Sequence, residues 1–279
     1  MKKIALFTAL LLSSALLAQD LPQPSPRGQA AQVVGLTKVS IDYGRPSMNG
    51  RAIFGGLVPF GEVWRTGANE CTSITFDGPV QFGSAQVPAG TYALFVIPGQ
   101  KTSTVILNKD AKQWGAYAYK AESDVAKEPT SNEECAPTEV FTIGFGAFKK
   151  DAARLDLSWE KTRISVWITA PSDAQAQKNI AEALAKPDAS AGAYSECAEF
   201  YLARGLDKTQ ALAWAKKSVE MKKMYWNNFT LANALHATGS IKEAIAAANE
   251  SVTLAEADGD KGAAEAYRKQ AAAWATSTK

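Results

Sequence analysis

The sequence contains a single histidine among 279 residues, and this scarcity argues against several classes of enzyme. Hydrolases that activate a serine or cysteine through a histidine base need that histidine close to the nucleophile. His236 instead lies in an alanine-rich segment, where we interpret it as a surface or groove residue of a helix. The chain also lacks the ligands of a zinc site made of histidine and cysteine, because its three cysteines are far apart in the sequence. We therefore expect no metal and no other cofactor.

Motifs for nucleotide binding and acyl transfer are also missing. The chain has no G-x-S-x-G, no P-loop and no dinucleotide-binding G-x-G-x-x-G. Ser158-Trp159-Glu160-Lys161 fits S-x-x-K, but this stretch alternates like a strand. A strand separates the serine from the lysine, whereas Ser–Lys chemistry places them one helical turn apart. We interpret the match as chance.

Cysteine is scarce and odd in number, which leaves at least one thiol free or in an intermolecular bond. Cys71 and Cys135 both lie in the first half of the chain, and we predict a disulfide between them. Cys197 falls in a helical pattern, where a small buried residue is expected.

The first 18 residues have the pattern of a secretory signal peptide. Lys2 and Lys3 precede an apolar stretch, residues 4–17, and Ala18 offers a small residue for cleavage. The stretch is shorter than the roughly 20 residues of a membrane span. No later segment is apolar enough to cross a membrane, so we expect an exported protein with no membrane span after cleavage.

The chain has no excess of positive or negative charge once the signal peptide is removed. Lys+Arg falls from 30 to 30 − 2 = 28, against 28 Asp+Glu, so the mature net charge is about zero. No basic block remains to attract phosphates over a distance. Nucleic acid is therefore not an expected partner.

The remaining chain is predicted to be an α+β protein in two parts. Residues 19–30 are rich in Pro, Gln and Ser and are predicted to be a flexible leader, and residues 31–170 to form an all-β sandwich or jelly roll. Alternating apolar residues predict strands, and turn signals such as Asn49-Gly50 separate them. The predicted strands cover residues 37–43, 71–76, 80–82, 91–97, 104–107, 140–148, 153–159 and 163–169.

Residues 171–279 are alanine-rich and predicted to be all-α. An internal repeat at an offset of 33 residues pairs Ala211 with Ala244 and Ala215 with Ala248. This period and alanine spacing resemble tetratricopeptide repeats, which predicts helical hairpins that could dock a peptide or protein. Ser240 and Glu243 form a predicted capping box at a helix start.

One segment of the sequence is a candidate binding site. Residues 43–70 hold six glycines, which indicate tight turns, together with several side chains able to recognise polar groups. A second aromatic cluster, residues 113–119, could form a wall of the same pocket. The alternative is a structural corner, in which Arg65 pairs with Glu70 or Glu62. The candidate ligand-binding residues are Arg45, Arg51, Trp64, Arg65, Asn69, Glu70, Trp114 and Tyr117.

These stretches carry a family resemblance. Gly44-Arg45-Pro46, residues 50–55 and 57–61, residues 63–70, residues 88–92 and Gln113-Trp114-Gly115-Ala116-Tyr117 resemble the domain-of-unknown-function family 2911. The resemblance covers about residues 25–170, and the helical tail resembles the tail that many such proteins carry. It implies an exported bacterial protein, in the periplasm or at the surface of a Gram-negative cell, and no assigned activity. Cys71 departs from the alanine that the pattern implies, and a disulfide to Cys135 would explain the change.

Three functions remain open at this point. The first is a non-enzymatic envelope module, which binds a polar or anionic ligand or a glycan in its β part and a partner on its helices. The second is a glycan hydrolase that uses two carboxylates, such as Glu70 and Glu62, about 5–9 Å apart. The third is a structural scaffold of the envelope.

Overall fold

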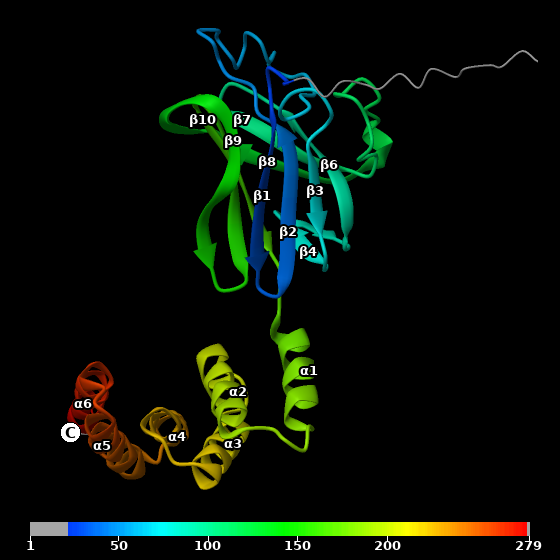
Figure 1. Cartoon of the computed structure of the whole chain (residues 1–279). Coiled ribbons are helices and arrows are strands. Elements are labelled where there is room, and N and C mark those ends of the chain that lie inside the picture. Colours follow the sequence, from blue (N-terminus) through cyan, green and yellow to red (C-terminus); the bar gives the residue numbers. More distant parts are fainter. Residues whose placement is uncertain (1–21, 278–279) are drawn as a thin grey trace, which may run out of the picture. The chain divides into compact units, whose positions relative to one another are not determined.

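The computed structural model describes residues 22–277, which fold into two compact units (Figure 1). The first unit ends at Ser172 and the second begins at Asp173. The predicted signal peptide, residues 1–18, lies outside the described residues.

The first unit contains two antiparallel sheets. The larger sheet has the strand order β1-β2-β3-β6-β7-β8, and the smaller has the order β5-β4-β10-β9. The strands are β1 (Arg27–Val34), β2 (Thr37–Gly44), β3 (Ser73–Phe76), β4 (Val80–Phe82), β5 (Ala85–Val87), β6 (Gly90–Ile97), β7 (Thr102–Asn108), β8 (Asp124–Ser131), β9 (Glu133–Lys149) and β10 (Ala152–Thr169).

One hydrophobic core joins the two sheets in a sandwich-like arrangement. Val39 and Ile41 of β2 belong to the same buried cluster as Leu155, Leu157 and Trp159 of β10. These residues alternate with more exposed ones along each strand, because successive side chains of a strand point to opposite faces. The alternation that predicted these strands is therefore the alternation of their burial.

The structure changes several predicted boundaries. Arg27–Val34 pairs along its whole length with β2, so residues 27–30 are strand rather than leader. Residues 153–159 and 163–169, predicted as two strands, belong to the single strand β10. That strand is irregular between them, where the register with β9 shifts and Glu160 has a φ of 57°. A β-bulge allows the chain to bend here without ending the strand.

The predicted Cys71–Cys135 disulfide is wrong, since all three cysteines are free. Cys71 lies just before β3 of the larger sheet, and its thiol donates a hydrogen bond to the Ala111 carbonyl (3.1 Å). Cys135 lies in β9 of the smaller sheet. Proximity in sequence placed two residues together that the fold assigns to different sheets. Burial raises the pKa of the Cys71 thiol, which favours an unreactive, packed residue.

The second unit consists of helices packed mainly against their sequence neighbours. They are α1 (Asp173–Leu184), α2 (Ala191–Arg204), α3 (Lys208–Met221), α4 (Tyr225–Ala237), α5 (Ile241–Asp258) and α6 (Lys261–Ser277). Ala211, Ala215, Ala244 and Ala248, the residues of the 33-residue repeat, are fully buried. Small residues at these positions let neighbouring helices approach closely. Cys197 is buried in α2, as predicted.

The predicted capping box of α5 is absent. The helix does begin after Ser240, but the Ser240 side chain makes no capping hydrogen bond. Its backbone, with φ −79° and ψ 60°, departs from the extended conformation in which a serine usually caps a helix.

Candidate functional site

The segment between β2 and β3, residues 45–72, forms one wall of the candidate site. It is tied to the larger sheet at Trp64, whose backbone N–H donates to the Val96 carbonyl (2.8 Å), while the Val96 N–H donates to the Trp64 carbonyl (3.0 Å). Close packing of Gly44 against Ala68 anchors the end of the same segment. The segment is therefore held rigidly at both places.

Trp64 forms the floor of the site and belongs to the core. Its ring stacks on Trp159 (centroids 5.8 Å apart, planes at 17°) and meets Phe54 and Phe141 edge to face. Only 9% of the residue is exposed. Aromatic contacts of this kind add to the energy of burial, so the position of Trp64 is strongly determined.

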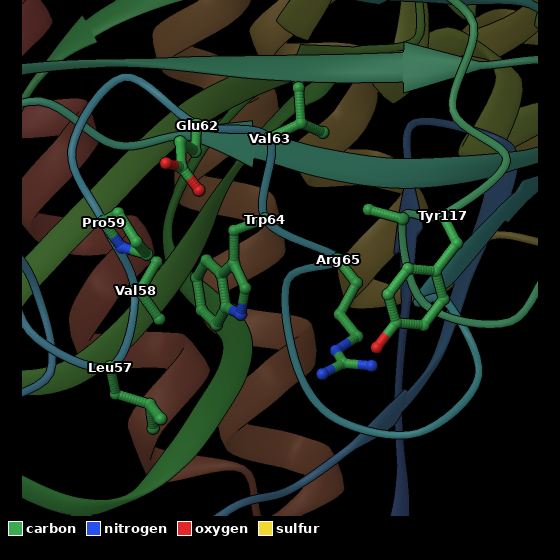
Figure 2. Close-up of a pocket in the computed structure, with 9 residues that line it drawn as sticks. Leu57, Val58, Pro59, Glu62, Val63, Trp64, Arg65 and Tyr117 are labelled. Atoms are coloured by element: carbon green, nitrogen blue, oxygen red, sulfur yellow. The ribbon is translucent and has the colours of Figure 1, made fainter.

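A pocket of about 290 Å³ opens above this floor (Figure 2). We call it the Arg65 pocket, and it is lined by Leu57, Val58, Pro59, Glu62, Val63, Trp64, Arg65, Ala116 and Tyr117. The structure thus brings together three of the predicted site residues, Trp64, Arg65 and Tyr117. Tyr117 comes from a segment about 50 residues further along the chain, and 85% of it is exposed.

Arg65 is the cation of this pocket. Its side chain is half-buried, and a Cβ atom placed on Gly115 would lie 3.0 Å from its Nη1 and 3.2 Å from the Tyr117 ring. Figure 2 shows the guanidinium near the hydroxyl end of Tyr117, with Glu62 beyond Trp64. Within residues 22–277, no carboxylate pairs with Arg65 and no acceptor receives a hydrogen bond from its guanidinium. The predicted corner, with Arg65 paired to Glu62 or Glu70, is therefore not formed.

The other two predicted arginines donate hydrogen bonds to neighbouring groups of the protein. Arg45 donates from Nη2 to the Thr142 hydroxyl (3.1 Å) and from Nε to the Phe141 carbonyl (3.4 Å). Arg51 donates to the carbonyls of Met48 (2.8 Å) and Ser47 (2.6 Å), within its own turn. Their guanidinium groups hold the loop, and neither residue lines the Arg65 pocket.

Asn69 and Glu70 also lie outside the Arg65 pocket. Asn69 adopts a left-handed conformation (φ 64°), which asparagine tolerates better than most residues, and its side chain donates to the Ser25 carbonyl (3.2 Å). Glu70 pairs with Arg27 at 3.5 Å, and Arg27 also pairs with Asp42. Sequence reasoning missed Arg27, because it fell in the predicted leader.

Trp114, the last predicted site residue, lies on a second concave surface. It forms an isolated bridge with Glu70, and 58% of it is exposed. It lines a hollow together with Arg27, Glu70 and Lys112, separate from the Arg65 pocket. The eight predicted residues therefore belong to two hollows and to the loop scaffold around them.

A buried hydrogen-bond network supports the segment that carries Trp114 and Tyr117. The Tyr119 hydroxyl donates to one oxygen of Asp124 (2.6 Å), and the Asn108 amide donates to the other (2.7 Å). The Asp124 side chain is only 4% exposed, and Lys127 pairs with it at 2.9 Å. Charge-assisted hydrogen bonds of this kind fix the segment on β7 and β8.

Replacing Tyr119 with phenylalanine is expected to reduce the loss of stability at high pH. Burial, and then the hydrogen bond to Asp124, raise the pKa of Tyr119 above its ordinary value of about 10. Above pH 10 the unfolded chain loses this proton while the folded protein keeps it, so stability falls as the pH rises. From pH 8 to pH 11, the free energy of unfolding should fall by about 1 kcal/mol more in the wild type than in the variant. Urea unfolding at both pH values measures this, and equal losses would contradict it.

Residues 22–277 contain no group of three or more His, Cys, Asp or Glu residues placed to hold a metal ion. None of the helices within that range combines the length and the apolar character needed to cross a membrane. His236 is half-buried and stacks on Trp274, with ring centroids 4.4 Å apart.

Comparison with known proteins identifies the β unit. The family model described as "Protein of unknown function (DUF2911)" matches residues 25–168, which is slightly more than half of the chain. No curated protein and no solved structure matches the chain. The matched range includes the Arg65 pocket and Trp114, so both surfaces lie in the family's domain.

Proposed function

The chain belongs to the DUF2911 family, whose function is unknown, and we propose that its β unit binds a small anionic ligand in the Arg65 pocket. The observation that carries this proposal is a half-buried arginine with no acceptor among the described residues, in a pocket with an aromatic wall. A guanidinium matches the planar geometry of a carboxylate or phosphate and can donate two hydrogen bonds to it. A pocket of about 290 Å³ suits a small molecule.

Binding without catalysis fits the pocket better than glycan hydrolysis. A carboxylate-based glycosidase needs two carboxyl groups facing one cleft. Glu62 is the one acidic residue among those that line the Arg65 pocket, whereas Glu70 lines the other hollow and pairs with Arg27. The geometry therefore supports a binding module rather than the hydrolase.

The signal-peptide pattern of residues 1–18 supports a place in the cell envelope for this module. We propose that it acts in the periplasm or at the cell surface. The helical unit, built of sequential hairpins, would contribute a surface for a peptide or protein partner; this part of the proposal stays a prediction from the repeat pattern.

Thermal-shift measurements test the Arg65 pocket. The chain without residues 1–18 would be heated with acetate, succinate, citrate, glucuronate or inorganic phosphate. A ligand present at 100 times its Kd stabilises the folded state by about 2.7 kcal/mol, which raises the Tm by several degrees. We expect at least one anion to do so and Arg65→Ala to abolish the shift.

Arg51→Ala is the matched control, since it removes an arginine of the same segment from outside the pocket. It is expected to lower the Tm of the free protein slightly and to keep the ligand-induced shift. A ligand shift that persists in Arg65→Ala, or a flat response to all five anions, would count against the proposal.

A further inference from the structure

Two neighbouring hollows form a groove beside the larger sheet that the proposed function does not use. The first, of about 770 Å³, is lined by Ser73, Thr91, Lys109, Asp110, Ala111, Lys112, Gln113, Ala118 and Lys120. The second, of about 350 Å³, is lined by Arg27, Glu70, Cys71, Ser73, Ala111, Lys112, Gln113 and Trp114. Because the two hollows share Ser73, Ala111, Lys112 and Gln113, they are continuous. We call them together the Lys112 groove.

The Lys112 groove carries a local excess of positive charge. Lys109, Lys112 and Lys120 are exposed and pair with no carboxylate of residues 22–277, and Asp110 is the one acidic residue in the larger hollow. In the smaller hollow, Arg27 and Glu70 pair with each other. Three lysines against one aspartate leave two positive charges unbalanced at one end. Such a concentration attracts an anion, although the whole chain is close to neutral.

Gln113, in the middle of the groove, has an unused acceptor. Its amide nitrogen donates to the Asp110 carbonyl (2.6 Å), but its Oε1 atom is buried and has no hydrogen-bond partner within residues 22–277. A buried acceptor without a donor is unfavourable, and a hydrogen-bond donor of a ligand would satisfy it after a small turn of the Gln113 side chain toward the groove. The ligand that fits therefore carries a hydrogen-bond donor, such as a hydroxyl group, as well as a negative charge.

Trp114 presents a flat aromatic surface at the other end. It is 58% exposed, yet its backbone is held in place by the bridge with Glu70 and by the hydrogen bond from the Cys71 N–H to the Gln113 carbonyl (3.1 Å). An exposed tryptophan ring on a fixed backbone offers a flat apolar face to a ligand. Its ring can pack against the apolar face of a sugar.

We infer that the Lys112 groove binds an anionic saccharide. The lysines hold its carboxylate or phosphate, Gln113 accepts a hydrogen bond from one of its hydroxyl groups, and Trp114 packs on a ring. No residue lines both this groove and the Arg65 pocket, so the inference is independent of the proposed function.

Isothermal titration calorimetry with four probes tests the inference. Trigalacturonate is a saccharide with carboxylate groups, and glucose 6-phosphate is a saccharide with a phosphate group. Maltotriose is a neutral saccharide, and inorganic phosphate is an anion that has no sugar ring. We expect at least one of the first two to bind at least about tenfold more tightly than maltotriose and inorganic phosphate. Which of the two binds identifies the carboxylate or the phosphate as the recognised group.

Variants then locate the binding. Replacing Lys109, Lys112 and Lys120 together with alanine is expected to weaken binding about tenfold, and Trp114→Ala to weaken it by a similar factor. Alanine at Lys216, Lys217 and Lys269, exposed lysines of the helical unit, removes the same charge elsewhere and should leave the Kd unchanged. Arg65→Ala should also leave it unchanged, which separates this groove from the Arg65 pocket.

Three results would overturn the inference. These results are read in Arg65→Ala, in which anion binding to the Arg65 pocket does not contribute. Equal affinity for maltotriose and the anionic sugars would remove the role of the lysines, and equal affinity for inorganic phosphate would remove the roles of Gln113 and Trp114. Unchanged binding in both the triple-lysine and Trp114 variants would place the saccharide elsewhere. The substituted lysines and Trp114 are exposed, so we expect these variants to fold, and unchanged unfolding curves would verify this for them and for Arg65→Ala.

Discussion

Trp159→Ala is expected to lower the free energy of unfolding by about 3–5 kcal/mol, a large part of the stability of a single domain. Trp159 is 1% exposed, and its ring stacks on Trp64 and lies against Phe141. Its Nε1 donates a hydrogen bond to the Glu139 carbonyl (3.2 Å). Alanine would leave a cavity below Trp64, while the Glu139 carbonyl would keep the hydrogen bond that it accepts from the Met48 N–H (2.9 Å). Urea unfolding followed by circular dichroism measures the change.

Trp167→Ala is the matched control for this prediction. Trp167 lies in the same strand, β10, but it is only half-buried, with Lys149 over its ring. Its loss removes less buried area, so we expect a decrease of about 1–2 kcal/mol. An equal effect of the two substitutions would contradict the role of Trp159 in the core. Because Trp159 supports the floor of the Arg65 pocket, its substitution should also weaken ligand binding there.

Gly44→Ala is expected to lower the free energy of unfolding by about 3 kcal/mol. A Cβ atom at Gly44 would lie 2.2 Å from the carbonyl oxygen of Ala68 and 2.9 Å from its carbonyl carbon. Both are backbone atoms, which cannot move aside as the end of a flexible side chain can. The end of β2 and the segment that carries Trp64 and Arg65 would have to separate. Urea unfolding measures the effect on stability.

Gly144→Ala is the control, since the space around its Cβ position is empty to 4 Å and its φ is not in the left-handed region. We expect a change of less than about 1 kcal/mol, because alanine also reduces the freedom of the unfolded chain. A Gly44→Ala variant as stable as Gly144→Ala would show that β2 and residues 67–70 are less tightly packed than the structure indicates.

The sequence pattern predicted strands where one face is buried and missed both edge strands of the larger sheet. Val39, Ile41 and Tyr43 of β2 alternate with more exposed residues, and all three are buried. β1 and β8 were not predicted, and they form the two edges of the larger sheet. Edge strands have fewer packing neighbours, so their side chains stay largely half-exposed and show little hydrophobic period.

The sequence indicated which segments contribute to the candidate site, but not which of their side chains line the pocket. Of the arginines and aromatic residues between positions 43 and 70, Trp64 and Arg65 line the pocket, and residues 113–119 contribute Tyr117. Nothing in the sequence distinguished Arg65, which has no partner among the described residues, from Arg45 and Arg51, which bind backbone carbonyls. That difference depends on which carbonyls lie within about 3 Å of each guanidinium.

The sequence by itself determined the order of a β part followed by an α part, the family resemblance and the scarcity of histidine and cysteine. These depend on composition and on the local period of hydrophobic residues, which a linear pattern contains. Only the tertiary structure decided the cysteine states, the partner of Glu70 and the separation of the Arg65 pocket from the Lys112 groove. Each depends on contacts between residues tens of positions apart, such as Arg27 with Glu70, and strand pairing sets these contacts rather than sequence proximity.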